Sequence, residues 1–272
     1  MTYSHPLIIF PEELWTTSQN KIASSSKEIG FYLIGTRWRE RYLIYDLVEF
    51  NYEIQSTTFL EGNALSKILL INSILPVLSL IGTLHSHPFI SESKDLFPSA
   101  IDVENLRNQH KDLLILSSKD GAIRSFYFEN HTLVELKTLI RPLKEEELPK
   151  IIWINGLRVI IPSGMSKWEL NMYVIPKFAD FLYNVYFNQS KLEIKTKDSY
   201  SLKIKPYIYL VRENSPFQIP YIFFFEKSTS IKDLLNKITL IFSPAQPKVK
   251  YKGSCIDADT LVVNFSGEVL FL

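Results

Sequence analysis

Two histidines, His85 and His87, stand one residue apart in the segment GTLHSHPFISESKDLFPSAID, residues 82–102. The run before them is apolar, which predicts a buried strand, and residues i and i+2 of a strand point to the same face. We therefore expect the two imidazoles side by side, close enough to share one metal ion. A His-x-His pair alone is a weak signal, because two packed or surface histidines give the same pattern.

Three neighbours strengthen the metal hypothesis. Pro88 ends the expected strand directly after the second histidine. Asp102 falls in the first turn of a helix expected from residue 100, with Ser99 as its N-cap, although a helix-capping motif by itself also explains this Ser-x-x-Asp pair. Glu28 opens the apolar run EIGFYLIG, either as the exposed end of a strand or as an acid directed into a site.

Two histidines and one aspartate make a three-ligand zinc site that keeps a fourth position for water, which is the pattern of catalytic sites. The pKa of water bound in such a site falls from about 15.7 toward roughly 7. A nearby carboxylate can take its proton and pass it to a leaving amine, and a hydroxyl can hydrogen-bond the oxyanion. Glu28 and Ser99 are the candidates for these two roles.

Three segments, KEIGFYLIGT (27–36), IGTLHSHP (81–88) and PSAIDVENL (98–106), together resemble the JAMM (MPN+) metalloprotease family. This family includes the isopeptidases of the proteasome lid and the signalosome, with archaeal and bacterial relatives. The resemblance covers about residues 5–140. It implies an α/β fold of the cytidine-deaminase-like MPN type, in which a central mixed β-sheet is flanked by helices.

The resemblance also implies the roles of the site residues. His85, His87 and Asp102 would ligate one Zn²⁺ per chain, Glu28 would be the general base and acid, and Ser99 would stabilise the tetrahedral intermediate. The protein would then be a deubiquitinase-like isopeptidase that hydrolyses the amide bond at the C-terminus of a ubiquitin-like protein, in deconjugation or in precursor processing. The residues themselves support only metal-assisted hydrolysis.

The chain departs from the family pattern in one loop. The family usually has seven residues between the second histidine and the serine, whereas eleven (88–98) intervene here. Asp95 is a rival third ligand, but Glu92 stands where the serine would be. Loops on a rigid scaffold often carry recognition. We therefore expect the apolar residues of this loop to contact the substrate tail or to close over it: Phe89, Ile90, Leu96 and Phe97. The alternative is that Leu96 and Phe97 pack under the helix that Ser99 caps.

The elements that position these residues follow from the hydrophobic pattern. Strands are expected at 7–10, 28–36, 42–50, 80–87, 112–118, 122–128 and 132–140, and helices at 11–25, 65–77 and 100–111. The charged segment 141–150, bracketed by prolines, is the expected linker between a metalloprotease domain (1–140) and a second domain (151–272).

The second domain is expected to be α+β and of unassigned type. We expect a helix at 167–187 that breaks near Pro176, a hairpin at 191–206, a strand at 221–226, a helix at 230–238 and a closing hairpin at 260–272. This order faintly resembles the β-grasp, the ubiquitin-like fold, but many α+β domains share it. The chain ends in GEVLFL rather than Gly-Gly, so a conjugatable modifier is not expected.

Composition sets wider bounds on function. The 272 residues suggest one large or two ordinary domains, 46% of them are apolar, and the net charge is +1. Residues 1–150 hold 15 Lys/Arg against 19 Asp/Glu, and residues 151–272 hold 15 against 10, which suggests different partners for the two parts. Cys255 is the only cysteine, so no intramolecular disulfide forms.

We expect a cytoplasmic protein without a signal peptide or a membrane span. The uncharged run 68–84 is 17 residues long but contains Asn72 and Pro76, which favours a buried helix followed by a buried strand. The charge balance of the whole chain does not favour nucleic-acid binding. Two alternatives stay open beside the enzyme: a non-catalytic MPN scaffold subunit of a larger complex, and a nucleic-acid-binding role led by the Lys- and aromatic-rich segment 191–209.

Overall fold

The computed structural model divides the chain into two compact units. The first comprises residues 1–69, 78–150 and 162–164, and the second comprises residues 70–77, 151–161 and 165–272. No helix among the described residues has the length and apolar character needed to cross a membrane. The structure describes residues 5–50, 52–55, 59–61, 64–90, 92–108, 113–129, 132–187, 206–242 and 247–272.

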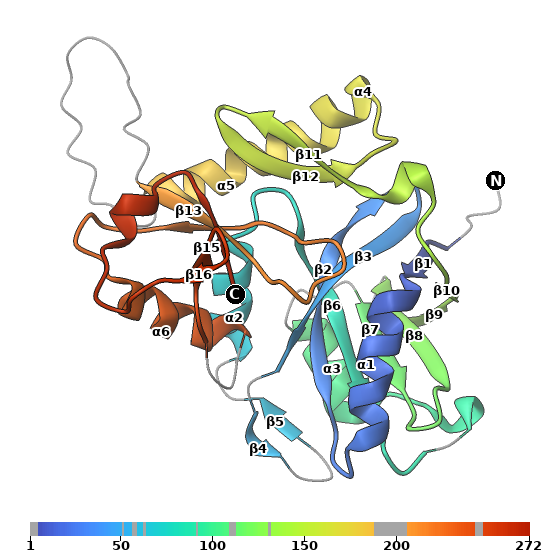
Figure 1. Ribbon diagram of the computed structural model, residues 1–272. Helices are drawn as coiled ribbons and strands as arrows, with labels where there is room; N and C mark the ends of the chain where they lie inside the picture. The colour runs from blue at the N-terminus through green and yellow to red at the C-terminus, as the bar shows by residue number, and fades with distance from the viewer. Residues whose placement is uncertain are drawn as a thin grey trace. The chain divides into compact units, whose positions relative to one another are not determined.

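The first unit is built on one mixed sheet (Figure 1). Its eight strands lie in the order β10-β1-β3-β2-β6-β7-β8-β9. The pairs β1–β10, β1–β3 and β6–β7 are parallel, and the other four pairs are antiparallel. The strands are β1 (Leu7–Phe10), β2 (Gly30–Trp38), β3 (Arg41–Glu49), β6 (Ser79–Ser86), β7 (Leu113–Ser117), β8 (Ile123–Glu129), β9 (Thr132–Leu136) and β10 (Thr138–Ile140).

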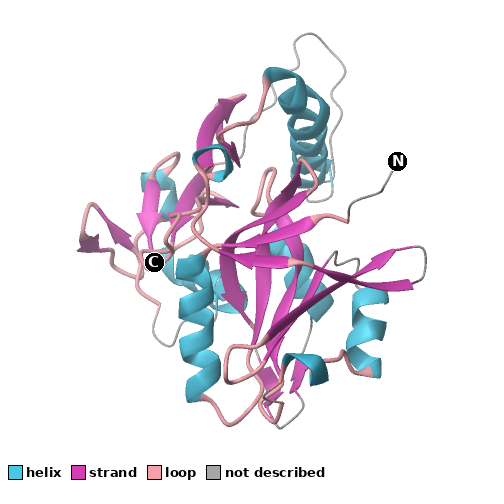
Figure 2. Cartoon of the chain, turned by 90° about the vertical axis from the view of Figure 1, so that its right-hand side faces the viewer, coloured by secondary structure: helices cyan, strands magenta, loops and turns pink. Residues whose placement is uncertain are grey.

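Helices cover both faces of this sheet, with α1 (Glu12–Ser24) on one face and α3 (Ala100–Asn108) on the other (Figures 1 and 2). The central strands are apolar on both faces because both are covered, and β2, β3, β6 and β7 are buried almost throughout. The predicted mixed sheet flanked by helices is confirmed.

Two further features of this region differ from the expected elements. Helix α2 (Ala64–Asn72) ends four residues before Pro76. A short hairpin of β4 (Tyr52–Gln55) and β5 (Phe59–Glu61) was not predicted.

The sheet curls, so that its two ends come close together in space. The edge strands β9 and β10 are separated only by Lys137, although they stand at opposite ends of the strand order. The hydroxyls of Ser125 on β8 and Thr138 on β10 lie 2.6 Å apart. The single expected strand at 132–140 is thus two strands that pair with different neighbours.

The segment predicted as a linker, residues 141–150, lies within the first unit. A 3₁₀ turn at Glu145–Glu147 carries the fully buried carboxylate of Glu147. That carboxylate pairs with Arg41 at 2.8 Å and with Arg141 at 2.7 Å. Part of the charge that suggested an exposed linker therefore forms an internal ion-pair cluster.

The second unit contains a five-stranded sheet in the order β14-β13-β17-β15-β16 and a separate β11–β12 hairpin. Val159, Phe178, Tyr209 and Ile222 are fully or almost fully buried in its apolar core. The strands are β11 (Pro149–Ile154), β12 (Leu157–Pro162), β13 (Tyr207–Val211), β14 (Tyr221–Phe224), β15 (Lys250–Tyr251), β16 (Ser254–Cys255) and β17 (Val269–Phe271), and the helices are α4 (Lys167–Glu169), α5 (Ile175–Phe187) and α6 (Ile231–Phe242).

The predicted break near Pro176 is wrong. A wide π turn at Leu170–Val174 joins α4 to α5, so the helix runs on through the proline. Proline has no backbone N–H to donate within a helix, and a π turn just before it is one way a helix adjusts its hydrogen bonding. The helix begins with a capping box in which the Ser166 hydroxyl accepts a hydrogen bond from the backbone N–H of Glu169.

The predicted closing hairpin is also wrong in part. Residues Val262–Phe265 form a 3₁₀ turn rather than a strand, and β17 pairs in parallel with β13 and antiparallel with β15. The helix expected at 230–238 is confirmed as α6, and Ser230 and Asp233 cap its start reciprocally. The hairpin expected at 191–206 lies, except for its last residue, outside the described residues.

Candidate metal centre

The two histidines lie at the end of β6, in the middle of the first sheet. β6 stands between β2 and β7, and Gly82 in β6 allows a close approach to β7 because a Cβ there would collide with the backbone of Leu113. Beyond the strand end, the backbone N–H of His87 still donates to the carbonyl of Ser117 at 2.8 Å. This bond keeps His87 in line with His85, so both imidazoles leave the same face.

That face is the one covered by α3. Alternation along β6 sends the intervening Ser86 to the opposite face, where its hydroxyl accepts a hydrogen bond from the backbone N–H of Ile29. On that opposite face, Gln19 of α1 donates to the hydroxyl of Ser117 on β7. The sheet thus separates a serine-lined α1 side from an α3 side that carries the histidines.

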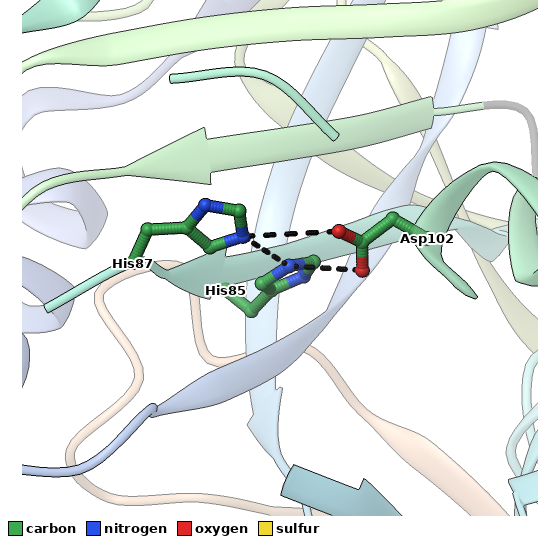
Figure 3. A group of neighbouring side chains, drawn as sticks. All are labelled: His85, His87 and Asp102. Atoms are coloured by element: carbon green, nitrogen blue, oxygen red, sulfur yellow. Dashed lines mark hydrogen bonds and ion pairs between the residues drawn. The ribbon is translucent and has the colours of Figure 1, made fainter. Parts of the chain in front are cut away.

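Three side chains converge on the α3 side (Figure 3). The Nε2 atoms of His85 and His87 are 3.2 Å apart. Asp102 directs Oδ1 to Nε2 of His85 at 3.2 Å, and its Oδ2 lies 3.8 Å from Nε2 of His87. The His85 side chain is 5% exposed, and those of His87 and Asp102 are each 14% exposed. The cluster is therefore mostly enclosed and still reaches solvent.

Asp102 is held in place by the start of α3. The backbone N–H of Ser99 donates to Oδ2 of Asp102 at 2.7 Å, and the backbone N–H of Asp102 donates to the Ser99 hydroxyl at 3.2 Å. This reciprocal pair is a capping box. The predicted capping motif is confirmed, and the same geometry directs the carboxylate at the histidines.

The surroundings of Asp102 keep its side chain ionised. Partial burial acts to raise the pKa of the carboxyl, but hydrogen bonds with His85, His87 and Ser99 and the charge of His85 outweigh it. The pKa of Asp102 consequently lies far below its usual range. Metal ligands must be deprotonated to bind, and Asp102 meets that condition at every physiological pH.

The donor set fits a divalent metal ion. Ligand–metal distances of about 2.0–2.2 Å place the ligand atoms of a tetrahedral zinc site roughly 3.3–3.6 Å apart. The two 3.2 Å separations are close to this edge length, and the 3.8 Å one is slightly longer. Within the described parts of the chain, these are the three residues whose ligand atoms gather within 4.8 Å of one another. They can hold a metal ion.

Glu28 precedes β2, the neighbour of β6. Gly30 of β2 pairs with His85, and the backbone N–H of Ser86 donates to the carbonyl of Ile29 at 2.9 Å. Extending this antiparallel register by two residues from the Gly30–His85 pair, past the start of β2, places Glu28 opposite His87. Directly opposed residues of antiparallel strands project from the same face, so a continuation of this register past the start of β2 would assign Glu28 to the α3 side. Its side chain is half-buried.

The long loop between His87 and Ser99 contains one fully buried residue. Leu96 packs with Leu106 of α3, Leu116 of β7 and Phe126 of β8, and Ile90 packs against the same cluster. Phe89 and Phe97 are instead 74% and 59% exposed. Of the four residues expected to contact a substrate, Leu96 and Ile90 thus support the helix start, and Phe89 and Phe97 are open to solvent.

Asp95, His5 and Cys255 lie outside the three-residue cluster. Asp95 is exposed in the 3₁₀ turn Ser93–Asp95, and Asp102 stands beside the histidines. His5 is exposed and contacts the hydroxyl of Tyr127 at 3.1 Å. Cys255 is an exposed free thiol. The two remaining histidines fall outside the described residues: His110 and His131.

Two solved structures illustrate a distant structural similarity to known proteins. No protein-family model and no curated protein matches the sequence. Protein DSY2949 from Desulfitobacterium hafniense, known from a solution structure, is 15% identical with a TM-score of 0.40, over 51% of this chain and 95% of that chain. AF2198, a JAB1/MPN domain protein from Archaeoglobus fulgidus, is 16% identical with a TM-score of 0.30, over 49% and 98%. The inference of a metal centre therefore rests on the geometry of the site.

Proposed function

We propose that the first unit is a zinc-dependent metallopeptidase of the JAMM type. The observation that carries the proposal is the convergence of His85, His87 and Asp102 at distances close to the edges of a tetrahedral zinc site, with the carboxylate fixed by a helix cap. Three protein ligands leave a fourth position for water or substrate. One Zn²⁺ per chain is the proposed cofactor.

The proposed reaction is hydrolysis of an amide bond. When bound, the metal lowers the pKa of a water molecule and polarises the substrate carbonyl. Glu28 takes one proton from the attacking water while the new carbon–oxygen bond forms, and it gives a proton to the leaving nitrogen as the carbon–nitrogen bond breaks. The register of β2 and β6 supports this role, because its continuation would assign Glu28 to the face of the histidines, outside the three-residue cluster.

Ser99 has a second role in this proposal. In its hydrogen bond with the backbone N–H of Asp102 the hydroxyl is the acceptor, so that bond leaves its own proton for another partner. An exposed hydroxyl on the first turn of α3 can direct this proton to the oxyanion that develops on the carbonyl oxygen. Ser99 therefore combines a helix cap with stabilisation of the tetrahedral intermediate.

The proposed substrate is the C-terminal tail of a ubiquitin-like protein, in a conjugate or in a precursor. This choice rests on the resemblance of the motifs to the JAMM family. The exposed rings of Phe89 and Phe97 support it physically, because each lies two residues along the chain from His87 or Ser99 and offers apolar surface to an extended peptide. Two residues of chain span at most about 7 Å.

A non-catalytic scaffold is less favoured, because a scaffold has no need of three convergent ligand side chains with an ionised carboxylate. Cleavage of a panel of ubiquitin-like conjugates and precursors, with and without a chelator, tests the enzyme directly. We expect cleavage of at least one substrate, its loss on chelation and its return with Zn²⁺. Metal-loaded protein that cleaves no member of the panel would argue against the proposed substrate class.

A further inference from the structure

Arg124 lies in one row with the metal cluster. On β6, β7 and β8, His85 pairs with Leu116, and Leu116 pairs with Arg124. Paired residues on adjacent strands share a face and are separated by a strand spacing of about 4.8 Å. The Arg124 backbone is therefore about two strand spacings from that of His85, on the α3 side of the sheet, with Leu116 between them.

The Arg124 guanidinium is fixed on one side by β9. Its Nε and Nη2 donate to the two carboxylate oxygens of Glu135, at 2.9 and 2.6 Å. Such a two-point contact defines the plane and the direction of the guanidinium as well as its position. The Arg124 side chain is only 15% exposed.

The same guanidinium contacts the loop that leads to Asp102. Its central carbon is 4.2 Å from the centroid of the Phe97 ring, within the range of a cation–π contact. Its Nη1 reaches the carbonyl of Lys94 with a long hydrogen bond of 3.5 Å. Arg124 thus contacts the loop at two positions, five and two residues before Ser99.

The loop is held from below by one further residue. Leu96 is fully buried against Leu106, Leu114 and Leu116. Leu96 holds the loop against the sheet. The contacts of Arg124 with Lys94 and Phe97 hold the loop in position along the face of the sheet. Ser99 and Asp102 follow directly in the chain, so the position of the loop determines the position of the start of α3.

We propose that Arg124, held by Glu135, is a positioning residue that sets where Asp102 meets the two histidines. The inference rests on the proposed metal centre and extends it to a pair of residues that touch neither the metal ligands nor the reacting atoms. Groups that orient metal ligands typically change metal affinity by about 10–100-fold when they are removed. The long loop needs a positioning residue, because its extra length would otherwise leave the position of Asp102, the third ligand, poorly defined.

A role in stability alone predicts a different result. The Glu135 side chain is 51% exposed, and ion pairs that reach solvent contribute little to folding. Phe97 is 59% exposed, so it is not a core contact. Losing Arg124 should therefore change metal binding far more than thermal unfolding of the metal-free protein.

The test is metal affinity in the full chain, measured by Zn²⁺ competition, together with the absorption spectrum of the Co²⁺-substituted protein. We expect Arg124→Leu to weaken Zn²⁺ binding about 10–100-fold and to change the Co²⁺ spectrum. Arg124→Lys keeps a cation near Phe97 but loses the two-point contact, so its affinity should be intermediate. The matched control is Arg37→Leu, which removes an arginine from the exposed Arg37–Glu40 ion pair of the same sheet.

Glu135→Gln provides a second variant that leaves Arg124 in place and keeps the test decisive if Arg124→Leu fails to fold. It should weaken Zn²⁺ binding by several-fold. Wild-type affinity and an unchanged Co²⁺ spectrum in the folded Arg124 and Glu135 variants would overturn the inference while leaving the metal centre intact. An equal loss in Arg37→Leu would also overturn it. A wild-type protein that binds no metal would reject the centre and the inference together.

Discussion

Ser99 and Asp102 hold each other at the first turn of α3, and the same Asp102 carboxylate faces both histidines. The backbone N–H of Ser99 donates to Oδ2 at 2.7 Å, while Oδ1 lies 3.2 Å from Nε2 of His85. One motif therefore serves as a helix cap and as a device that directs a metal ligand. The two interpretations of Ser-x-x-Asp in the sequence are compatible for this reason.

Glu28→Gln should separate proton transfer from metal binding. The amide keeps the size of the side chain but cannot accept the proton, so we expect hydrolysis to fall by about 10²–10⁴-fold with unchanged zinc content. Turnover of the proposed substrate and metal analysis on the same sample measure both effects. Cys255→Ser is the control and should keep full activity, since Cys255 is an exposed thiol outside the cluster. Near-normal turnover in Glu28→Gln would reject the role given to Glu28.

Ser99 variants should distinguish the cap from the oxyanion contact. Ser99→Ala removes both, so it should cost about 0.5–2 kcal/mol of stability and about 10²–10³-fold in kcat. Ser99→Thr keeps the hydroxyl and should restore much of both. Thermal unfolding and kcat are the measurements. If Ser99→Ala loses only stability and keeps its kcat, Ser99 is a cap and nothing more.

Two apolar residues of the long loop should behave differently. Leu96→Ala opens a cavity in a packed cluster, so we expect a loss of about 2–5 kcal/mol in unfolding free energy. Phe89→Ala removes a ring that is 74% exposed, so stability should hold while KM for a ubiquitin-like substrate rises. Denaturant unfolding and steady-state kinetics check this pair. An unchanged KM in Phe89→Ala would remove this residue from the proposed substrate contacts.

The buried ion-pair cluster around Glu147 should make stability depend on pH. Burial acts to raise the pKa of Glu147, but hydrogen bonds from Arg141 and Lys144 and the charges of Arg141 and Arg41 lower it below its ordinary value. A lowered folded-state pKa contributes stability that is complete above the unfolded pKa of about 4.3 and is lost as the pH falls through the folded pKa.

Glu147→Gln tests this assignment. Near neutral pH the variant should lose unfolding free energy, because Arg41 and Arg141 lose their buried counter-charge. The loss should be smaller than the roughly 3–5 kcal/mol of a fully buried pair, since the two arginine side chains are 33% and 25% exposed. The difference from wild type should shrink as the pH falls below about 4. A difference that stays constant between pH 7 and pH 3 would mean that the charge of Glu147 is not what stabilises the cluster. Glu40→Gln, in an exposed ion pair, is the matched control.

Local signals in the sequence were sufficient to predict the elements around the metal centre. The apolar run before His85 and the capping pattern at Ser99 each determine one element, and both are found. The hairpin β11–β12, which is not among the expected elements, also has a local signal in the sequence. Its turn is Asn155–Gly156, both with positive φ, and Asn-Gly between apolar runs strongly favours a tight hairpin.

Other features depend on contacts between distant residues. The π turn before Pro176 keeps one helix where local rules predict a break. Segment 141–150 appears as a charged linker because its partner Arg41 is about a hundred residues away in the chain. The split of 132–140 into two strands follows from pairing at opposite ends of the sheet. Periodicity within a segment carries no information on such contacts.

Metal content of the purified full chain tests the central claim most directly. We expect about one zinc per chain in the wild-type protein, because three protein ligands and a water complete one tetrahedral site. His85→Ala, His87→Ala and Asp102→Ala should each strongly lower that occupancy. Asp95→Ala, which removes an exposed acid from the same loop, should keep it. A wild-type protein that neither contains nor takes up zinc, or one whose zinc is lost in Asp95→Ala and retained in Asp102→Ala, would contradict the proposed centre.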